Sequence, residues 1–194
     1  MLVNEIIERV RKIKPDILIE FRHSYIGPAM RRYGNILRVT DCPMDALKNR
    51  GDIINLRLTS GSTAVHSDML MWNSDASVET AALQLCCVMY GVPQISMRMD
   101  KLSKDHKDML KYYLSFWKKY RNVLLTGKLY ANNPESNYSL VFAEKDGVSV
   151  YTAYTNPVIH CSGTETVAIN STMSDMLIIA GGENKSYKVV DCKG

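Results

Sequence analysis

The chain has 194 residues, of which 46% are hydrophobic and 23% are charged, and its formal net charge is +4. This composition is typical of a globular protein with a buried core, and it excludes a disordered chain. Runs of basic residues are no longer than pairs such as Arg31-Arg32 and Lys118-Lys119, so the charge pattern predicts no nucleic-acid partner.

The cysteines and histidines predict neither a disulfide framework nor a metal site. The five cysteines include no CxxC pair, and the four histidines include no pair at i,i+4 spacing. We therefore expect free thiols and a reducing, cytoplasmic compartment. No apolar run approaches the ~20 residues that cross a bilayer, and no signal peptide is recognisable, so we expect no membrane partner either.

The first part of the chain alternates helical and strand-like patterns. Helices are predicted over residues 2–13, 29–33, 44–50, 78–90 and from Ser103 onward. Strands are predicted over residues 17–21, 36–39, 53–58 and 93–97. The strands are short, apolar and separated by helices, which predicts a parallel α/β sheet or barrel.

The pattern changes after residue 125 to short strands separated by turn residues. Asp146-Gly147 between two alternating runs is a strong hairpin signal. We expect a small antiparallel β-sandwich over 126–194, after an α/β domain over 1–125. Its strands are predicted over residues 138–143, 148–154, 164–170, 176–180 and 187–190.

Polar side chains follow three of the predicted parallel strands, and the carboxyl ends of such strands meet at one edge of a sheet. Asp41 has two interpretations. An Asp in a turn after a buried strand commonly forms an Asx-turn or caps a helix. Alternatively it is a general acid, and a second, ionised carboxylate nearby keeps its pKa high. In a retaining glycosidase the two carboxylates lie ~5–5.5 Å apart.

The other polar residues of this edge also leave two roles open. Arg22 is either a donor to a substrate hydroxyl or a counter-ion to Glu20 or Asp16. Asp68 caps a turn, lines a cleft or orients a partner group. Trp72 either stacks on a sugar ring or packs in the core.

A family resemblance selects among these possibilities. The chain resembles the carboxyl-terminal half of the catalytic barrel of α-galactosidases (melibiases) of glycoside hydrolase family thirty-six, over about residues 1–125. The segments that carry the resemblance are IEFRHSYIGPAMRRYGNILRVTDCPMDALKNR, LRLTSGSTAVHSDMLMW and VPQISMRMDKLSKDHKDMLKYYLSFWKKYRNVLL. It implies strands five to eight of a (β/α)8 TIM barrel, about four βα units, and a C-terminal β-domain.

The resemblance also implies roles for single residues. Asp41, after the sixth barrel strand, matches the proton donor (acid/base), and Arg22, on the fifth, matches an arginine that contacts galactose. His66 and Asp68 match substrate-binding positions near the rim of the pocket, after the seventh strand. The family hydrolyses terminal α-linked galactose, as in melibiose and raffinose, with retention and without a metal or nucleotide cofactor.

One part of the family pattern is missing. The family's nucleophile is an Asp in a Lys-x-Asp motif on the fourth barrel strand, and this sequence contains no match to it. We therefore expect a fragment of a longer α-galactosidase that is inactive without the N-terminal half of the barrel, with a homo-oligomer possible in the full-length enzyme. The alternative is a non-catalytic carbohydrate-binding or structural module derived from that barrel.

Overall fold

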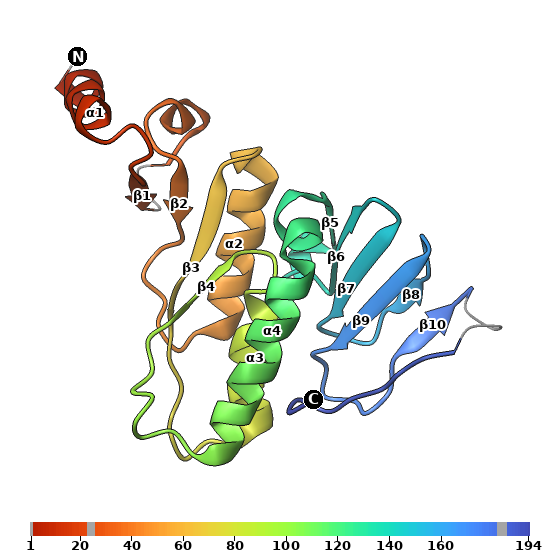
Figure 1. Cartoon of the computed structure of the whole chain (residues 1–194). Helices are drawn as coiled ribbons and strands as arrows, with labels where there is room; N and C mark the ends of the chain where they lie inside the picture. The colour runs from red at the N-terminus through yellow and green to blue at the C-terminus, as the bar shows by residue number, and fades with distance from the viewer. Residues whose placement is uncertain (1, 23–25, 182–185) are drawn as a thin grey trace.

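The computed structural model describes residues 2–22, 26–181 and 186–194, which form a mixed α/β structure with four α-helices (Figure 1). The first part consists of α1 (Leu2–Ile13), β1 (Glu20–Arg22), the 3-10 helix η1 (Pro28–Arg32), β2 (Ile36–Arg38), α2 (Ala46–Ser60), β3 (Ala64–Leu70), α3 (Val78–Cys87), β4 (Val92–Ile95) and α4 (Lys104–Thr126). Within the described residues, no helix is both long and apolar enough to cross a membrane.

The first four strands form one parallel sheet in the order β1-β2-β3-β4. Side chains alternate between its two faces because successive residues of a strand point to opposite sides. Leu37 and Val65 lie on the face covered by the helices and belong to the main hydrophobic core. Arg38 and His66 are paired in register on the other face, which carries no helix.

Helix α2 corrects the prediction of a strand over residues 53–58. Asp45 caps this helix by accepting a hydrogen bond from the Lys48 backbone N–H at 2.9 Å. The buried face combines apolar and polar side chains, which hid its helical period in the sequence: Asn49, Arg50, Ile53, Ile54, Leu56, Arg57 and Ser60. The third strand is instead β3, so His66 and Asp68 lie within a strand and not after it.

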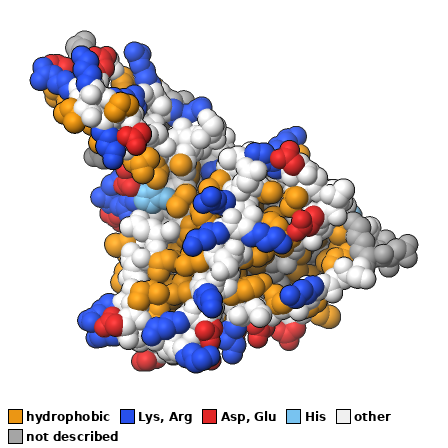
Figure 2. Space-filling view, in the orientation of Figure 1, with side chains coloured by type: hydrophobic (Ala, Val, Ile, Leu, Met, Phe, Trp, Pro, Cys, Tyr) orange, Lys and Arg blue, Asp and Glu red, His pale blue; other side chains and the backbone are white. Residues whose placement is uncertain are grey.

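The remaining elements of the first part are close to their predictions. Helices α3 and α4 begin after Ser77 and Ser103, whose hydroxyls accept backbone N–H groups as predicted. The first predicted strand is displaced, because β1 begins only at Glu20. Helix α1 is confirmed, but of its apolar residues only Ile7 is buried. Leu2, Ile6 and Ile13 are exposed, and Figure 2 shows hydrophobic side chains among charged ones on this outlying helix.

The second part contains two sheets. The strands are β5 (Lys128–Asn132), β6 (Leu140–Lys145), β7 (Val148–Ala153), β8 (Val158–His160), β9 (Glu165–Asn170) and β10 (Ile178–Ala180), with a 3-10 helix η2 (Pro134–Ser136). They are ordered β5-β6-β7-β9 and β10-β8. Asp146-Gly147 joins β6 to β7 as predicted, with positive φ at both residues, as a tight hairpin requires.

The expectation of purely antiparallel pairing in this part is wrong. Strand β7 pairs with β9 in parallel, and so does β10 with β8. A parallel pair needs a crossover, and here β8 and the chain around it connect β7 to β9. Residues 187–190 form no strand, whereas β5 and β8 were not predicted.

The helices lie between the two larger sheets, so the molecule is layered (Figure 1). Val141 and Val150 of the second part belong to the same hydrophobic core as Leu37 and Val65 of the first. On its other face, the β5-β6-β7-β9 sheet packs Leu140, among others, against β8 and β10. The division into domains over 1–125 and 126–194 stays a prediction.

Candidate functional site

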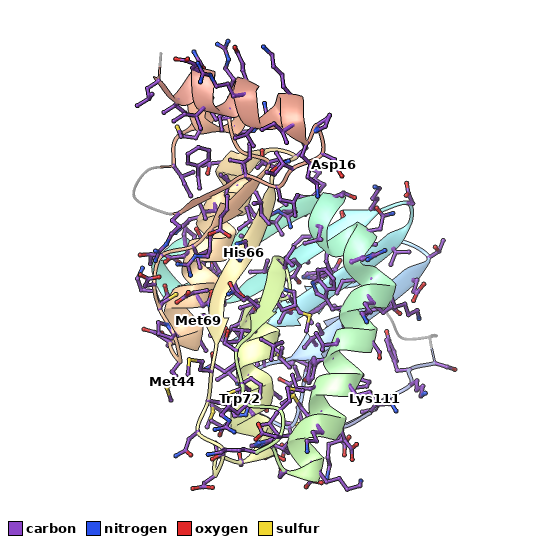
Figure 3. The ribbon with its side chains drawn as sticks, turned by 60° about the vertical axis from the view of Figure 1, so that its left-hand side comes forward. Asp16, Met44, His66, Met69, Trp72 and Lys111 are labelled. Carbon is purple, nitrogen blue, oxygen red and sulfur yellow. The ribbon has the colours of Figure 1, made fainter. Side chains whose placement is uncertain are left out.

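A cluster of charged side chains occupies the open face of the parallel sheet. Strand β1 contributes Glu20 and Arg22, β2 contributes Arg38, and β3 contributes His66 and Asp68. Because Arg22, Arg38 and His66 occupy the same level of the sheet in adjacent strands, their side chains meet on one face. Figure 3 shows His66 and Met69 along β3, with Met44 further toward the carboxyl end of the sheet.

The charged cluster borders a hollow of about 620 Å³ at the carboxyl ends of the strands. Its lining is mainly polar, with two apolar side chains on the rim: Glu20, Arg22, Arg38, Asp41, Pro43, Met69 and Gln94. A hollow of this size, with carboxylates and guanidinium groups converging on it, suits a small polar ligand.

Asp41 lies at the entrance of this hollow, with 64% of its side chain exposed. It does not cap helix α2, because Asp45 does so. Its Oδ1 accepts hydrogen bonds from Arg22 and, at 2.7 Å, from Arg38 Nη2. Hydrogen bonds from Arg22 and then Arg38 hold the pKa of the Asp41 carboxyl below its ordinary value. Asp41 is therefore ionised at neutral pH in this arrangement.

Arg22 is about half exposed and lies beside Asp41. Of the two counter-ion roles considered for it, the described structure records neither, because its ion pair is with Asp41. The guanidinium also lines the hollow, where it is available to a ligand hydroxyl.

Asp68 lies beneath the hollow, and none of its side chain is exposed. One carboxylate oxygen accepts a hydrogen bond from Arg38 Nη1, and the other accepts the Cys42 backbone N–H at 2.5 Å. The Asp68 backbone N–H in turn donates to Asn49 Oδ1 at 3.3 Å. With both oxygens occupied by the protein, Asp68 is placed to orient other groups and not to contact a ligand.

His66 is similarly enclosed. Its Nε2 lies 2.5 Å from a Glu20 carboxylate oxygen, and its Nδ1 lies 2.8 Å from the Ser67 carbonyl oxygen. Both ring nitrogens thus face acceptors, which are both satisfied only when the imidazole carries two protons. His66 supports Glu20, and it is Glu20 that lines the hollow.

Sequence reasoning missed Glu20 and Arg38 as site residues. Arg38 is only 9% exposed and lies between three carboxylates, those of Glu20, Asp41 and Asp68. The signal for it was an arginine inside a short apolar strand, where a charge needs partners on the same face. Trp72 proves to be a packing residue, 6% exposed, with its ring edge-on to His106.

Metal binding and thiol chemistry find no support in the side-chain clusters. Within the described part of the chain, no group of three or more His, Cys, Asp or Glu side chains is arranged to hold a metal ion. The five cysteines are free thiols, and burial raises the pKa of the Cys42 thiol to about 12, which makes it a poor nucleophile.

A scan against protein-family models and a search of curated proteins find no match to this chain.

Proposed function

We propose that this chain carries the proton donor of a retaining α-galactosidase that hydrolyses terminal α-linked galactose, as in melibiose and raffinose. The observation that carries the proposal is the convergence of Asp41, Arg22 and Glu20 on one hollow at the carboxyl ends of parallel strands. In (β/α)8 enzymes the active site lies at this end, on residues from several strands. The family resemblance supplies the galactoside chemistry.

The proposal includes a fold of which this sheet is one part. Four parallel strands in sequential order, with helices on one face and polar side chains on the other, match an arc of a (β/α)8 barrel, strands five to eight. The β-sandwich would follow the barrel. In the described residues the outer edges of β1 and β4 are unpaired, and α1 exposes its apolar face. The other four strands, as the missing N-terminal half of the barrel, would cover these surfaces.

In the reaction, Asp41 protonates the glycosidic oxygen as the leaving group departs. A carboxylate from the other half of the barrel attacks the sugar and forms a galactosyl-enzyme. Asp41, now ionised, removes a proton from water, which hydrolyses this intermediate. The ion pairs with Arg22 and Arg38 suit this second step. The first step requires release of Arg22, which a galactose hydroxyl would achieve by taking its guanidinium as a donor.

Metal and nucleotide cofactors have no part in this reaction. The proposal places the enzyme in the cytoplasm, with an α-galactoside as its small-molecule partner. Oligomerisation of the full-length enzyme stays a prediction.

The test is Asp41→Ala in the intact barrel. We expect hydrolysis of melibiose to fall by roughly 10²–10⁴-fold, the usual contribution of a general acid. Dinitrophenyl α-galactoside needs little protonation, so its conversion to the galactosyl-enzyme should change little. Azide should restore turnover and release α-galactosyl azide. Asp45→Asn, which keeps the cap of α2, is the matched control and should be fully active. An equal loss on both substrates without azide rescue would contradict the acid role.

The second candidate is a non-catalytic carbohydrate-binding or structural module. The observation that favours it is the low pKa of Asp41, because a firmly ionised carboxylate binds hydroxyls better than it donates a proton. Calorimetric titration of the chain with galactose separates the two. Binding by the chain alone, together with full activity of the Asp41→Ala barrel, would favour this module.

A further inference from the structure

The corner that carries Asp41 is held in place from below. Asp41 follows β2, and the chain then turns through Pro43 and Met44 into helix α2. Met44 has a φ of 67°, a left-handed conformation that is unfavourable for a residue with a side chain. Such a conformation persists only where the surroundings impose it.

Three contacts impose it here. The Cys42 backbone N–H donates to Asp68 Oδ2 at 2.5 Å, and the Cys42 carbonyl accepts the Asp45 N–H at 3.1 Å. Gln84 of helix α3 donates through Nε2 to the Met44 carbonyl at 2.9 Å. The backbone on either side of Pro43 is therefore tied to strand β3 and to helix α3.

Arg38 joins this support to the Asp41 side chain. Its Nη1 donates to the fully buried Asp68, and its Nη2 donates to Asp41 at 2.7 Å. Its Nε lies 3.6 Å from Glu20. A planar guanidinium presents its N–H groups in a fixed fork, so a carboxylate at one edge determines where a second carboxylate binds at another.

We infer that Arg38 and Asp68 are the positioning residues of this site: Asp68 holds Arg38 and the Cys42 backbone, and through them the Asp41 carboxylate stays over the hollow. This inference rests on the proposed function for its catalytic meaning. Neither residue takes part in bond breaking. Asp68 touches no atom of Asp41, so its effect on Asp41 must pass through Arg38 and the corner.

Asp68→Asn tests this in the 194-residue chain without any assay of activity. The measurement is the pKa of Asp41, from NMR titration of ¹³C-labelled carboxyl groups, with Asp41→Asn to assign the signal. Whichever way the new amide turns, its NH₂ faces either Arg38 or the Cys42 N–H, donor against donor. We expect Arg38 to withdraw from Asp41 and the pKa of Asp41 to rise.

The sign of the shift is decisive. If Asp68 acted on Asp41 only as a nearby negative charge, its removal would lower the pKa of Asp41. A fall, or no change, would overturn the inference. Asp45→Asn is the matched control, since it removes a carboxylate four residues from Asp41 and keeps the helix cap; we expect no rise there.

Arg38→Lys gives an independent reading if Asp68→Asn fails to fold. Lysine has one compact ammonium group and cannot bridge two carboxylates as the guanidinium fork does. The buried Asp68 has the greater need of a counter-ion, so we expect the introduced lysine to stay with it and the pKa of Asp41 to rise. An unchanged Asp41 titration would contradict the positioning role. If the titrations agree but the Asp41→Ala barrel remains fully active, positioning stands and the proposed function fails.

Discussion

At the scale of single residues, the open face of the sheet balances its charges internally. Glu20, Asp41 and Asp68 are matched by Arg22 and Arg38, with His66 between Glu20 and a backbone carbonyl. The balance is uneven in depth, because Asp68 is fully buried while Asp41 is largely exposed. The buried pair supports the structure, and the exposed carboxylate remains accessible for chemistry.

Asp41 should make the stability of the chain depend on pH in the acid range. Its pKa is lowered in the folded chain from an ordinary 3.8, so its ion pairs stabilise the fold above that pH. The stabilisation is lost as pH falls through the lowered pKa. We therefore expect the melting temperature of the wild type to exceed that of Asp41→Asn at pH 7, with the difference shrinking below about pH 3.8.

Arg22→Gln provides the control for this measurement. Arg22 is the largest cause of the lowered pKa, so in its absence the loss of melting temperature caused by Asp41→Asn should become smaller at pH 7. A loss that is the same with and without Arg22 would show that Asp41 stabilises the chain by other contacts.

At the scale of elements, predictions succeeded where local signals were sufficient. Ser103 precedes an amphipathic run, and helix α4 begins directly after it. Asp146-Gly147 likewise determined the β6–β7 hairpin. Helix α2 failed because buried Asn49, Arg50 and Arg57 interrupt its apolar pattern, and their partners lie far away in sequence. Arg57, for example, donates to the carbonyls of Tyr90 and Leu124.

The site was predictable to a similar degree. Asp41 and Arg22 were found because they follow strands, where parallel sheets commonly place functional groups. Arg38 was not found because its role depends on strand register, and the register comes from pairing between β1, β2 and β3 that no local pattern encodes. The lowered pKa of Asp41 was missed for the same reason.

Ser103→Ala tests the cap of helix α4. The Ser103 hydroxyl accepts the His106 backbone N–H at 3.2 Å, and loss of such a cap costs about 1 kcal/mol of unfolding free energy. Ser115→Ala, at an exposed position inside the same helix, should change stability little. Urea titrations followed by circular dichroism give both values, and equal effects of the two substitutions would contradict the cap.

At the scale of the whole molecule, one hydrophobic core spans the helices and the β5-β6-β7-β9 sheet. Tyrosines add polar links across this boundary. The buried Tyr90 hydroxyl lies 2.7 Å from the Val141 carbonyl and 3.0 Å from Thr152 Oγ1. The Tyr154 hydroxyl donates to the Cys86 carbonyl of helix α3 at 2.9 Å. Unfolding of either part would therefore expose the interface of the other.

Tyr90→Phe removes one of these links and leaves buried partners without a donor. Such groups cost about 1–3 kcal/mol each, so we expect a loss of that order in the unfolding free energy. Thermal melting should stay a single transition, because the apolar core is kept. Tyr130→Phe is the control, since it preserves the ring that stacks on Phe142 at 4.5 Å. Two separate transitions in the wild type would contradict the coupling of the two parts.

The sequential strand order has a consequence for biosynthesis. Each strand of the parallel sheet pairs with the strand translated just before it, from β1 through β4. The sheet is thus able to grow one βα unit at a time as the chain leaves the ribosome, without waiting for a distant partner. Until α4 and the later strands have been translated, however, the shared core is incomplete. Nascent chains that stop before Lys128 would therefore depend on chaperones to shield their apolar helix faces.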